Sequence, residues 1–192
     1  MQELLEIDKE IFLFLNNLGS AEWDWFWRAM SDKWTGLPLY LLLIYLSFKD
    51  YGWKITLLNM VLVTLLILAT GEVAYDFKQA FERLRPCAQE GVVEYARVVT
   101  RGCGGFSFVS AHATNSTGVA VFLFLLFKRF HNYFAAALLL WPVLTSYSRI
   151  YQALHYPSDV IAGIVLGVIL AFIVYQIQLF ISKKYLGADK IM

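Results

Sequence analysis

Apolar residues are gathered into long runs that short polar stretches separate. The runs cover 34–48, 55–76, 111–127, 133–148 and 160–182. About 20 helical residues at 1.5 Å each cross a hydrocarbon core of about 30 Å, and backbone groups inside lipid must hydrogen-bond within the segment. The pattern therefore predicts an all-α fold, a polytopic membrane bundle with about five spanning helices.

The first residues follow a different pattern. Apolar positions recur at helical spacing between charged ones, namely Leu4, Ile7, Ile11, Leu15 and Leu18. A helix of this kind is too charged to span a bilayer and is expected to lie on the bilayer surface. Ser20 is a candidate N-cap for a second short helix. We expect one membrane-embedded domain over 1–192, with interfacial helices over 1–33 and the spanning bundle over 34–184.

Composition agrees with a membrane protein. The 192 residues are 59% hydrophobic and 16% charged, well below the roughly 25% charged of soluble domains. A net charge of +1 gives no broad basic field, so nucleic acid is not an expected partner. The acidic first residues lack the basic region of a secretory signal, so we expect no cleaved signal peptide.

Lysine and arginine residues indicate the orientation. In a five-span bundle Lys49 and Lys54, Lys128 and Arg129, and Lys183 and Lys184 fall on one side, which the positive-inside rule assigns to the cytoplasm. The opposite, outer face also carries basic residues: Lys78, Arg83, Arg85, Arg97, Arg101 and Arg149. Positive charges kept against the topological trend indicate that this face binds an anion.

Three polar clusters share the outer face, at 78–86, 104–112 and 148–159. Taken singly, each has a plain structural interpretation: a solvated helix end, a capped histidine, a snorkelling arginine. A continuous helix ending at Pro86 would place Lys78 and Arg85 on nearly the same face. His112 stands where a spanning helix begins, and free N–H groups there bind anions. His131 falls in a cytoplasmic loop and is not expected to be catalytic.

Taken together, the clusters resemble a known signature. Lys78-x6-Arg85-Pro86, Ser110-Ala111-His112 and Ser148-Arg149-x5-His155-x3-Asp159 are similar to the three motifs of the type 2 phosphatidic acid phosphatase (PAP2) superfamily of membrane lipid phosphatases. The resemblance covers about 55–182. It departs from the family pattern at Ala111, where the family usually has glycine. A slightly altered phosphate pocket is therefore one alternative.

The resemblance implies a role for each motif residue. His155 attacks phosphorus and forms a phosphohistidine, Asp159 holds its other ring nitrogen, and His112 is the general acid and then the base. The phosphoryl oxygens are bound by Lys78, Arg85, Ser110, Ala111 and Arg149. We expect no metal or other cofactor, because three fixed cations can stabilise the transferring group.

Three further features carry expectations. Cys87 and Cys103 lie in the outer loop, where a disulfide can persist, although two free thiols remain the alternative. Glu72 and Asp76 are costly in lipid, so we expect them to face the bundle or the site. Gly163 and Gly167 suit close packing inside the bundle more than a dimer contact.

The predicted function is hydrolysis of a lipid phosphate or diphosphate at the outer face. An isoprenoid (undecaprenyl) diphosphate is the first choice, because compact loops leave little room for a sugar-binding surface. The alternatives are a lipid A phosphatase or a phosphatidylglycerol phosphate phosphatase, and, in another class, a non-catalytic lipid-binding or transport protein. We expect a bacterial inner-membrane protein whose site faces the periplasm or exterior. Its partners are the lipid substrate and the bilayer, and the sequence makes no prediction of oligomeric state.

Overall fold

The computed structural model describes residues 2–32, 34–100 and 102–187, and Arg101 lies outside them. Regular structure in the described residues is helical, which confirms the all-α prediction. The elements are α1 (Gln2–Asn17), η1 (Ala21–Trp23), α2 (Asp24–Met30), α3 (Leu37–Tyr51), α4 (Trp53–Phe81), η2 (Pro86–Ala88), α5 (Ala111–Phe127), α6 (Asn132–Leu138), α7 (Leu140–Tyr151) and α8 (Pro157–Leu186).

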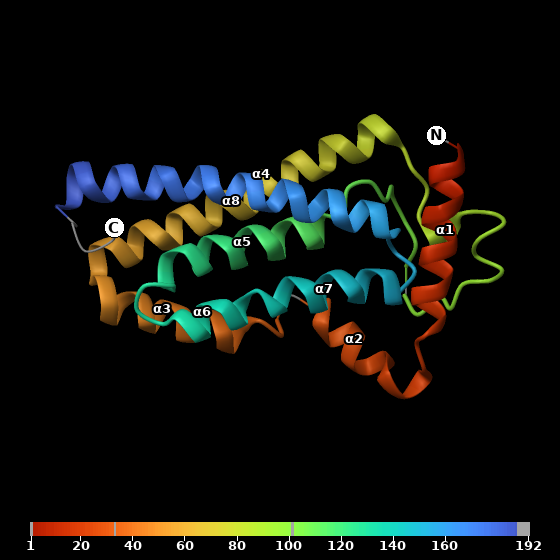
Figure 1. The fold of residues 1–192 in the computed structure, drawn as a ribbon, viewed down its shortest axis with the longest axis horizontal. Coiled ribbons are helices and arrows are strands. Elements are labelled where there is room, and N and C mark those ends of the chain that lie inside the picture. The colour runs from red at the N-terminus through yellow and green to blue at the C-terminus, as the bar shows by residue number, and fades with distance from the viewer. Residues whose placement is uncertain (1, 33, 101, 188–192) are drawn as a thin grey trace.

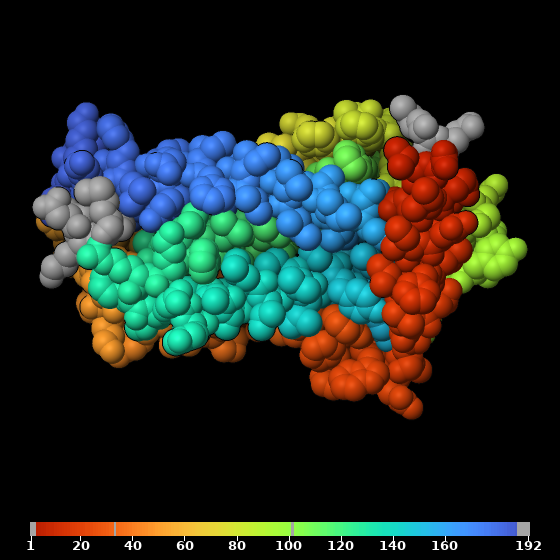
Figure 2. Space-filling model, viewed as in Figure 1, coloured from red at the N-terminus to blue at the C-terminus, as the bar shows by residue number. Residues whose placement is uncertain are grey.

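The bundle consists of α3, α4, α5, the α6–α7 pair and α8, which run along the long axis in alternating directions (Figure 1). In the described residues, two segments are long and apolar enough to cross a membrane, 53–88 and 157–186, and α5 is a shorter apolar helix. The helix α1 lies across one end of the bundle, which it covers in Figure 2. We call this the α1 end.

The helix α1 packs on the bundle through the face opposite most of its apolar stripe. Its buried residues are Asp8, Phe12 and Asn16, spaced four apart, whereas the apolar stripe that includes Leu4 and Leu18 is exposed. The amide of Asn16 donates to the carbonyl oxygens of Arg97, Ile150 and Tyr151. The face that docks α1 therefore combines the polar Asp8 and Asn16 with Phe12, and most of the apolar stripe points away from the protein.

Two predicted helix boundaries changed. The helix α4 ends at Phe81 because Glu82 adopts a left-handed conformation with φ of 46°, so the predicted continuous helix to Arg85 is wrong. The fourth apolar run is broken between α6 and α7 near Leu139. Pro142 explains the break, because it has no N–H for the carbonyl of Leu138 and its ring crowds that turn.

Close packing of α5 against α8 depends on glycine. A Cβ at Gly163 would lie 2.8 Å from the carbonyl oxygen of Ser110, and one at Gly167 would lie 2.5 Å from that of Thr114. Both glycines therefore face α5, as expected for packing within the bundle. This contact places the first turn of α5 beside the first turn of α8.

Candidate active site

All three motif clusters lie at the α1 end of the bundle. The first spans the end of α4 and the following turn, the second leads into α5, and the third joins α7 to α8 (Figure 1). The turn after α4 is bound to the other two: the N–H of Ser107 donates to the carbonyl of Arg83 at 2.8 Å, and that of Cys87 donates to the carbonyl of Ala153 at 3.0 Å. These bonds hold the three clusters together.

His155 and Asp159 form a buried pair at the start of α8. Pro157 is the first helical residue, so Asp159 falls in the first turn and its Oδ2 accepts the N–H of Tyr156 at 2.8 Å. His155 Nδ1 lies 3.6 Å from the same oxygen, which is longer than a hydrogen bond. The ring therefore turns Nδ1 toward the carboxylate and leaves Nε2 as the free nitrogen.

His155 is neutral at physiological pH. Burial lowers the pKa of His155 to about 4, the positive charges of Arg149 and Lys78 act in the same direction, and the Asp159 carboxylate opposes them. Burial dominates because water that would solvate the charged ring is excluded. A neutral imidazole keeps the lone pair that a nucleophile needs.

Three cations surround this pair without carboxylate partners. Among the described residues, no acidic side chain forms an ion pair with Lys78, Arg85 or Arg149. Lys78 and Arg85 are close enough to repel each other, as are Arg85 and Arg149. The Nε atoms of both arginines are buried and have no hydrogen-bond acceptor among the described groups. Cations crowded in this way are stabilised by a bound anion.

The first turn of α5 faces the same space. Ser110 is the N-cap and accepts the N–H of Ala113 through its hydroxyl oxygen, so its own hydrogen remains available. The first N–H groups of a helix, including that of Ala111, have no intrahelical acceptor. Lys78 reaches this turn and donates to the carbonyl of Val109 at 2.7 Å. The arrangement can bind a phosphoryl group.

His112 and His155 lie on the same side of the bundle, close enough for their charges to interact. The ring of His112 hydrogen-bonds to the backbone of Ser31. His112 also lines a cavity of about 530 Å³, whose walls are formed by residues of α3, α4, α5, α6 and α7 and include Phe127. The walls are mostly apolar, and α5 spans roughly 22 Å between these residues at 1.5 Å per residue.

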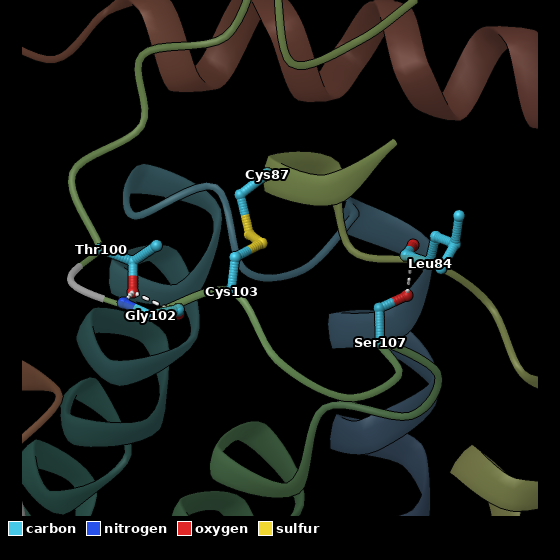
Figure 3. The surroundings of a disulfide bond; sticks show 6 residues. All are labelled: Leu84, Cys87, Thr100, Gly102, Cys103 and Ser107. Carbon is cyan, nitrogen blue, oxygen red and sulfur yellow. Dashed lines mark hydrogen bonds between the residues drawn. A yellow bond between two sulfur atoms is a disulfide. The ribbon is translucent and has the colours of Figure 1, made fainter. Parts of the chain in front are cut away.

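The structure joins Cys87 and Cys103 by a disulfide, with their Cα atoms 6.0 Å apart. Figure 3 shows that it links η2 to the loop that leads to α5. Nearby, the hydroxyl of Ser107 donates to the carbonyl of Leu84 at 3.2 Å (Figure 3). The bridge thus ties the first motif to the second next to Pro86.

The structure also places Glu72, Asp76 and His131, whose positions the sequence predicted. Glu72 and Asp76 are exposed, so the prediction that they face the bundle or the site is wrong. Their helix turns them outward because Ala74, between them, is the buried residue of that turn. His131 lies between α5 and α6 at the opposite end from α1 and contacts Asp50 at 2.8 Å, as its exclusion from the site requires.

One residue at the site was not identified from the sequence. Arg83, between Lys78 and Arg85, donates to Oδ1 of Asp159 at 2.7 Å and to Oδ2 of Asp8 at 2.6 Å. Its partners are 76 and 75 positions away in the chain. The sequence held one signal for a role of Arg83: it is a further arginine on the outer face, where basic residues were already in excess.

The chain is similar to proteins of known activity and structure. It is 35% identical over 167 residues to a lipid A 4'-phosphatase from Bacteroides thetaiotaomicron, covering 85% of this chain and 73% of that protein. It is 31% identical over 194 residues to a lipid A 4'-phosphatase from Porphyromonas gingivalis, covering 98% and 80%.

Two crystal structures share the fold. One is a transmembrane PAP2-type phosphatidylglycerolphosphate phosphatase from Bacillus subtilis, with a TM-score of 0.73, 18% identity and coverage of 96% of this chain and 90% of that one. The other is Aquifex aeolicus LpxE, with a TM-score of 0.68, 24% identity and coverage of 87% and 93%. The sequence pattern of the PAP2 superfamily matches residues 53–183, so the chain belongs to the PAP2 superfamily.

Proposed function

We propose that this PAP2 phosphatase removes a phosphate from a lipid of the lipid A class. The observation that carries the proposal is the group of three cations without carboxylate partners beside a neutral, buried His155. Such a site suits a phosphoryl group, because phosphoryl transfer depends mostly on positioning and charge stabilisation. Lys78, Arg85 and Arg149 bind the oxygens, together with the hydroxyl of Ser110 and the N–H of Ala111.

In the first step, Nε2 of His155 attacks phosphorus while the bond from phosphorus to the lipid oxygen breaks. The negative charge of the bound phosphate favours the protonated form of His112, which gives its proton to that oxygen, and the lipid leaves as an alcohol. Nδ1 of His155 keeps its proton, so the phosphorylated ring is positive. Asp159, 3.6 Å from Nδ1, offsets this charge.

In the second step, His112 is neutral and takes a proton from water. The water oxygen attacks phosphorus, the bond from phosphorus to Nε2 breaks, and phosphate leaves. His155 returns to its neutral form and His112 to its protonated form, so the cycle closes. The cations neutralise the oxygens in both steps, and the mechanism assigns no role to a metal ion.

The apolar cavity beside His112 suits the leaving lipid. The residue that protonates the leaving oxygen must be adjacent to the lipid, and His112 stands at the start of this cavity. One acyl chain extending from the site toward Phe127 would lie against apolar side chains of α3, α4 and α5.

The lipid A class is favoured over the first choice from the sequence. The curated relatives are lipid A 4'-phosphatases, and they lend no support to undecaprenyl diphosphate. The argument from compact loops fails because a sugar headgroup can stay in water while the phosphate and an acyl chain are bound. The sugar headgroup therefore needs no dedicated protein surface.

The proposed membrane arrangement follows from the bundle. Five passes, made by α3, α4, α5, α6–α7 and α8, belong to a single domain over 1–192. The exposed apolar stripe of α1 rests on the bilayer, as do the exposed rings of Trp23 and Trp25 in the segment that includes α2. The protein lies in a bacterial inner membrane, with the α1 end facing the periplasm or exterior.

A substrate panel tests the proposal. Purified protein in detergent is given lipid A, undecaprenyl diphosphate, phosphatidylglycerol phosphate and phosphatidic acid, and phosphate release is measured. We expect lipid A to give the highest kcat/KM and the variant His155→Ala to be inactive, with His131→Asn as an active control. A preference for undecaprenyl diphosphate would overturn the substrate assignment. An active His155→Ala variant would overturn the mechanism.

A further inference from the structure

We infer that Asp8 and Arg83 are positioning residues of the active site, which hold the Asp159 carboxylate and, through it, His155. The inference rests on the proposed function of His155 as the nucleophile. Asp8 belongs to α1, outside the region 53–183 that matches the family, and Arg83 is not one of the motif residues. The helix that lies across the α1 end is thereby part of the catalytic apparatus.

Arg83 completes the hydrogen bonding of Asp159. One carboxylate oxygen, Oδ2, accepts the N–H of Tyr156 and faces His155. The other, Oδ1, accepts Nη1 of Arg83 at 2.7 Å. The side chain of Asp159 is fully buried, so Oδ1 would otherwise have no water to bond. With both oxygens bound, the carboxylate is held against rotation, and the contact between Oδ2 and His155 is preserved.

The orientation of Arg83 is itself fixed from several directions. Nη1 also donates to the hydroxyl of Ser158 at 2.7 Å, and Nη2 donates to Asp8 at 2.6 Å. The centre of the guanidinium lies 3.9 Å from the centroid of the Tyr156 ring. A planar fork with fixed donor directions is needed to reach Asp8 and Asp159 at once, which a lysine ammonium cannot reproduce.

Asp8 binds both Arg83 and the start of α8. Its Oδ1 accepts the N–H of Ser158 at 2.9 Å, and its Oδ2 accepts the Ser158 hydroxyl. Asp8 also balances the charge of Arg83. Without this second carboxylate, the positive charge of Arg83 would be directed at Asp159 alone and would weaken the attraction of Asp159 for the ring of His155 as that ring becomes positive.

The chain offers a matched control pair. Arg97 donates to Asp24 at 2.6 Å, and its guanidinium lies 5.3 Å from the centroid of the Tyr151 ring. This arrangement repeats the chemistry of Asp8 and Arg83 at the same end of the bundle. Neither Arg97 nor Asp24 contacts His155 or Asp159 among the interactions of the described residues.

The experiment compares the two pairs in full-length protein in detergent. The variants are Asp8→Asn, Arg83→Met, Arg83→Lys and the double variant of Asp8→Asn with Arg83→Met, with Asp24→Asn and Arg97→Lys as controls. The substrate is the lipid phosphate that the wild type hydrolyses fastest. Thermal unfolding is measured for each variant, so that kcat is compared only among folded proteins. Arg83→Lys retains the charge and serves if Arg83→Met does not fold.

Because both residues act through Asp159, we expect kcat to fall about 10- to 100-fold in Asp8→Asn and Arg83→Met, with KM within about twofold of the wild type. Arg83→Lys should recover part of the loss. Asp8→Asn should add little in the Arg83→Met background, because the two act through one network. The control variants should lower thermal stability and leave kcat unchanged.

Two outcomes overturn the inference. Wild-type kcat in Asp8→Asn and in the folded Arg83 variants reduces the network to a structural role. Equal losses of kcat in the control variants show that any disturbance at this end has the same effect. The variant His155→Ala separates this inference from the function on which it rests. If His155→Ala is active, the mechanism is refuted. If His155→Ala is inactive and the Arg83 variants are fully active, only the positioning network is refuted.

Discussion

Asp159 and His155 face each other across 3.6 Å, from Oδ2 to Nδ1, where the loop after α7 enters α8. The carboxylate comes from the first helical turn and the ring from the loop, so the geometry of this junction sets the distance. The contact turns Nδ1 of the ring toward the carboxylate, and the positive charges of Arg149 and Lys78 act on the ring.

His112 has a role that depends on the leaving group. We expect His112→Asn to lower kcat about 10²- to 10⁴-fold on a lipid phosphate, the usual contribution of a general acid or base. An aryl phosphate whose leaving group is acidic needs no proton to depart, so phosphohistidine formation from it should be affected much less. The measurement is the burst of released phenol in rapid mixing.

The comparison needs His131→Asn as a control, because His131 lies at the opposite end of the bundle and contacts Asp50. If His112→Asn slowed the burst equally on both substrates, His112 would not be the acid of the first step.

The low pKa of His155 makes stability depend on pH. Burial lowers this pKa to about 4 in the folded protein, from a usual value of 6.5. Between these values the unfolded chain binds a proton that the folded protein does not, so stability falls as pH decreases from 6.5 to 4. His155→Asn removes this titration. The melting temperature of the wild type relative to His155→Asn should therefore decrease across that window and be constant above it.

The disulfide should stabilise the outer loop. It closes a separation of 16 residues, which is worth about 3 kcal/mol in the chain-entropy model. Cys87→Ser with Cys103→Ser should therefore melt at a lower temperature. A reductant should lower the melting temperature of the wild type but not that of the double variant. Alkylation of unreduced, denatured wild type at both cysteines would show that the bridge is absent.

The glycines between α5 and α8 should be intolerant of a methyl group. Gly167→Ala would bring a Cβ to 2.5 Å from the backbone oxygen of Thr114, so the two helices must separate and thermal stability must fall. Gly71→Ala is the matched control, because no atom lies within 4 Å of its added Cβ. It should be neutral or raise stability by up to about 1 kcal/mol. Equal effects at the two positions would contradict the packing argument.

Local signals predicted the elements that carry the motifs. The helix that begins at Ala111 follows an N-capping serine, and α8 begins at a proline, both of which are recognisable in sequence. The end of α4 was not predicted, because a glutamate rather than a glycine adopts the left-handed conformation at Glu82. No local pattern indicates such a residue.

The supporting residues of the site could not be predicted for a different reason. Asp8 and Arg83 are 75 positions apart, and their pairing depends on how α1 docks. The apolar stripe of α1 indicated the bilayer surface, but it did not show which face of the helix docks on the bundle. The repeat of Asp8, Phe12 and Asn16 at intervals of four was visible in the sequence and marks the face that is buried.

The cavity beside His112 should select lipids by their acyl chains. Ile67 lines it from α4, and Leu68, the next residue, does not. Both side chains are substantially exposed, at 41% and 59%, so replacing either with the larger side chain of tryptophan should leave the fold intact. Ile67→Trp fills space that an acyl chain needs, whereas Leu68→Trp points elsewhere.

We expect Ile67→Trp to lower kcat/KM for a long-chain lipid phosphate about tenfold, which corresponds to roughly 1.4 kcal/mol of lost binding. Its kcat/KM for a short-chain analogue should be close to that of the wild type, because a short chain ends before Ile67. Leu68→Trp should behave like the wild type with both. If Ile67→Trp affected both chain lengths equally, the substitution would have disturbed the phosphate site, and the cavity would not be the chain's binding site. If it affected neither, the acyl chains must lie on the outer surface of the bundle, in contact with lipid.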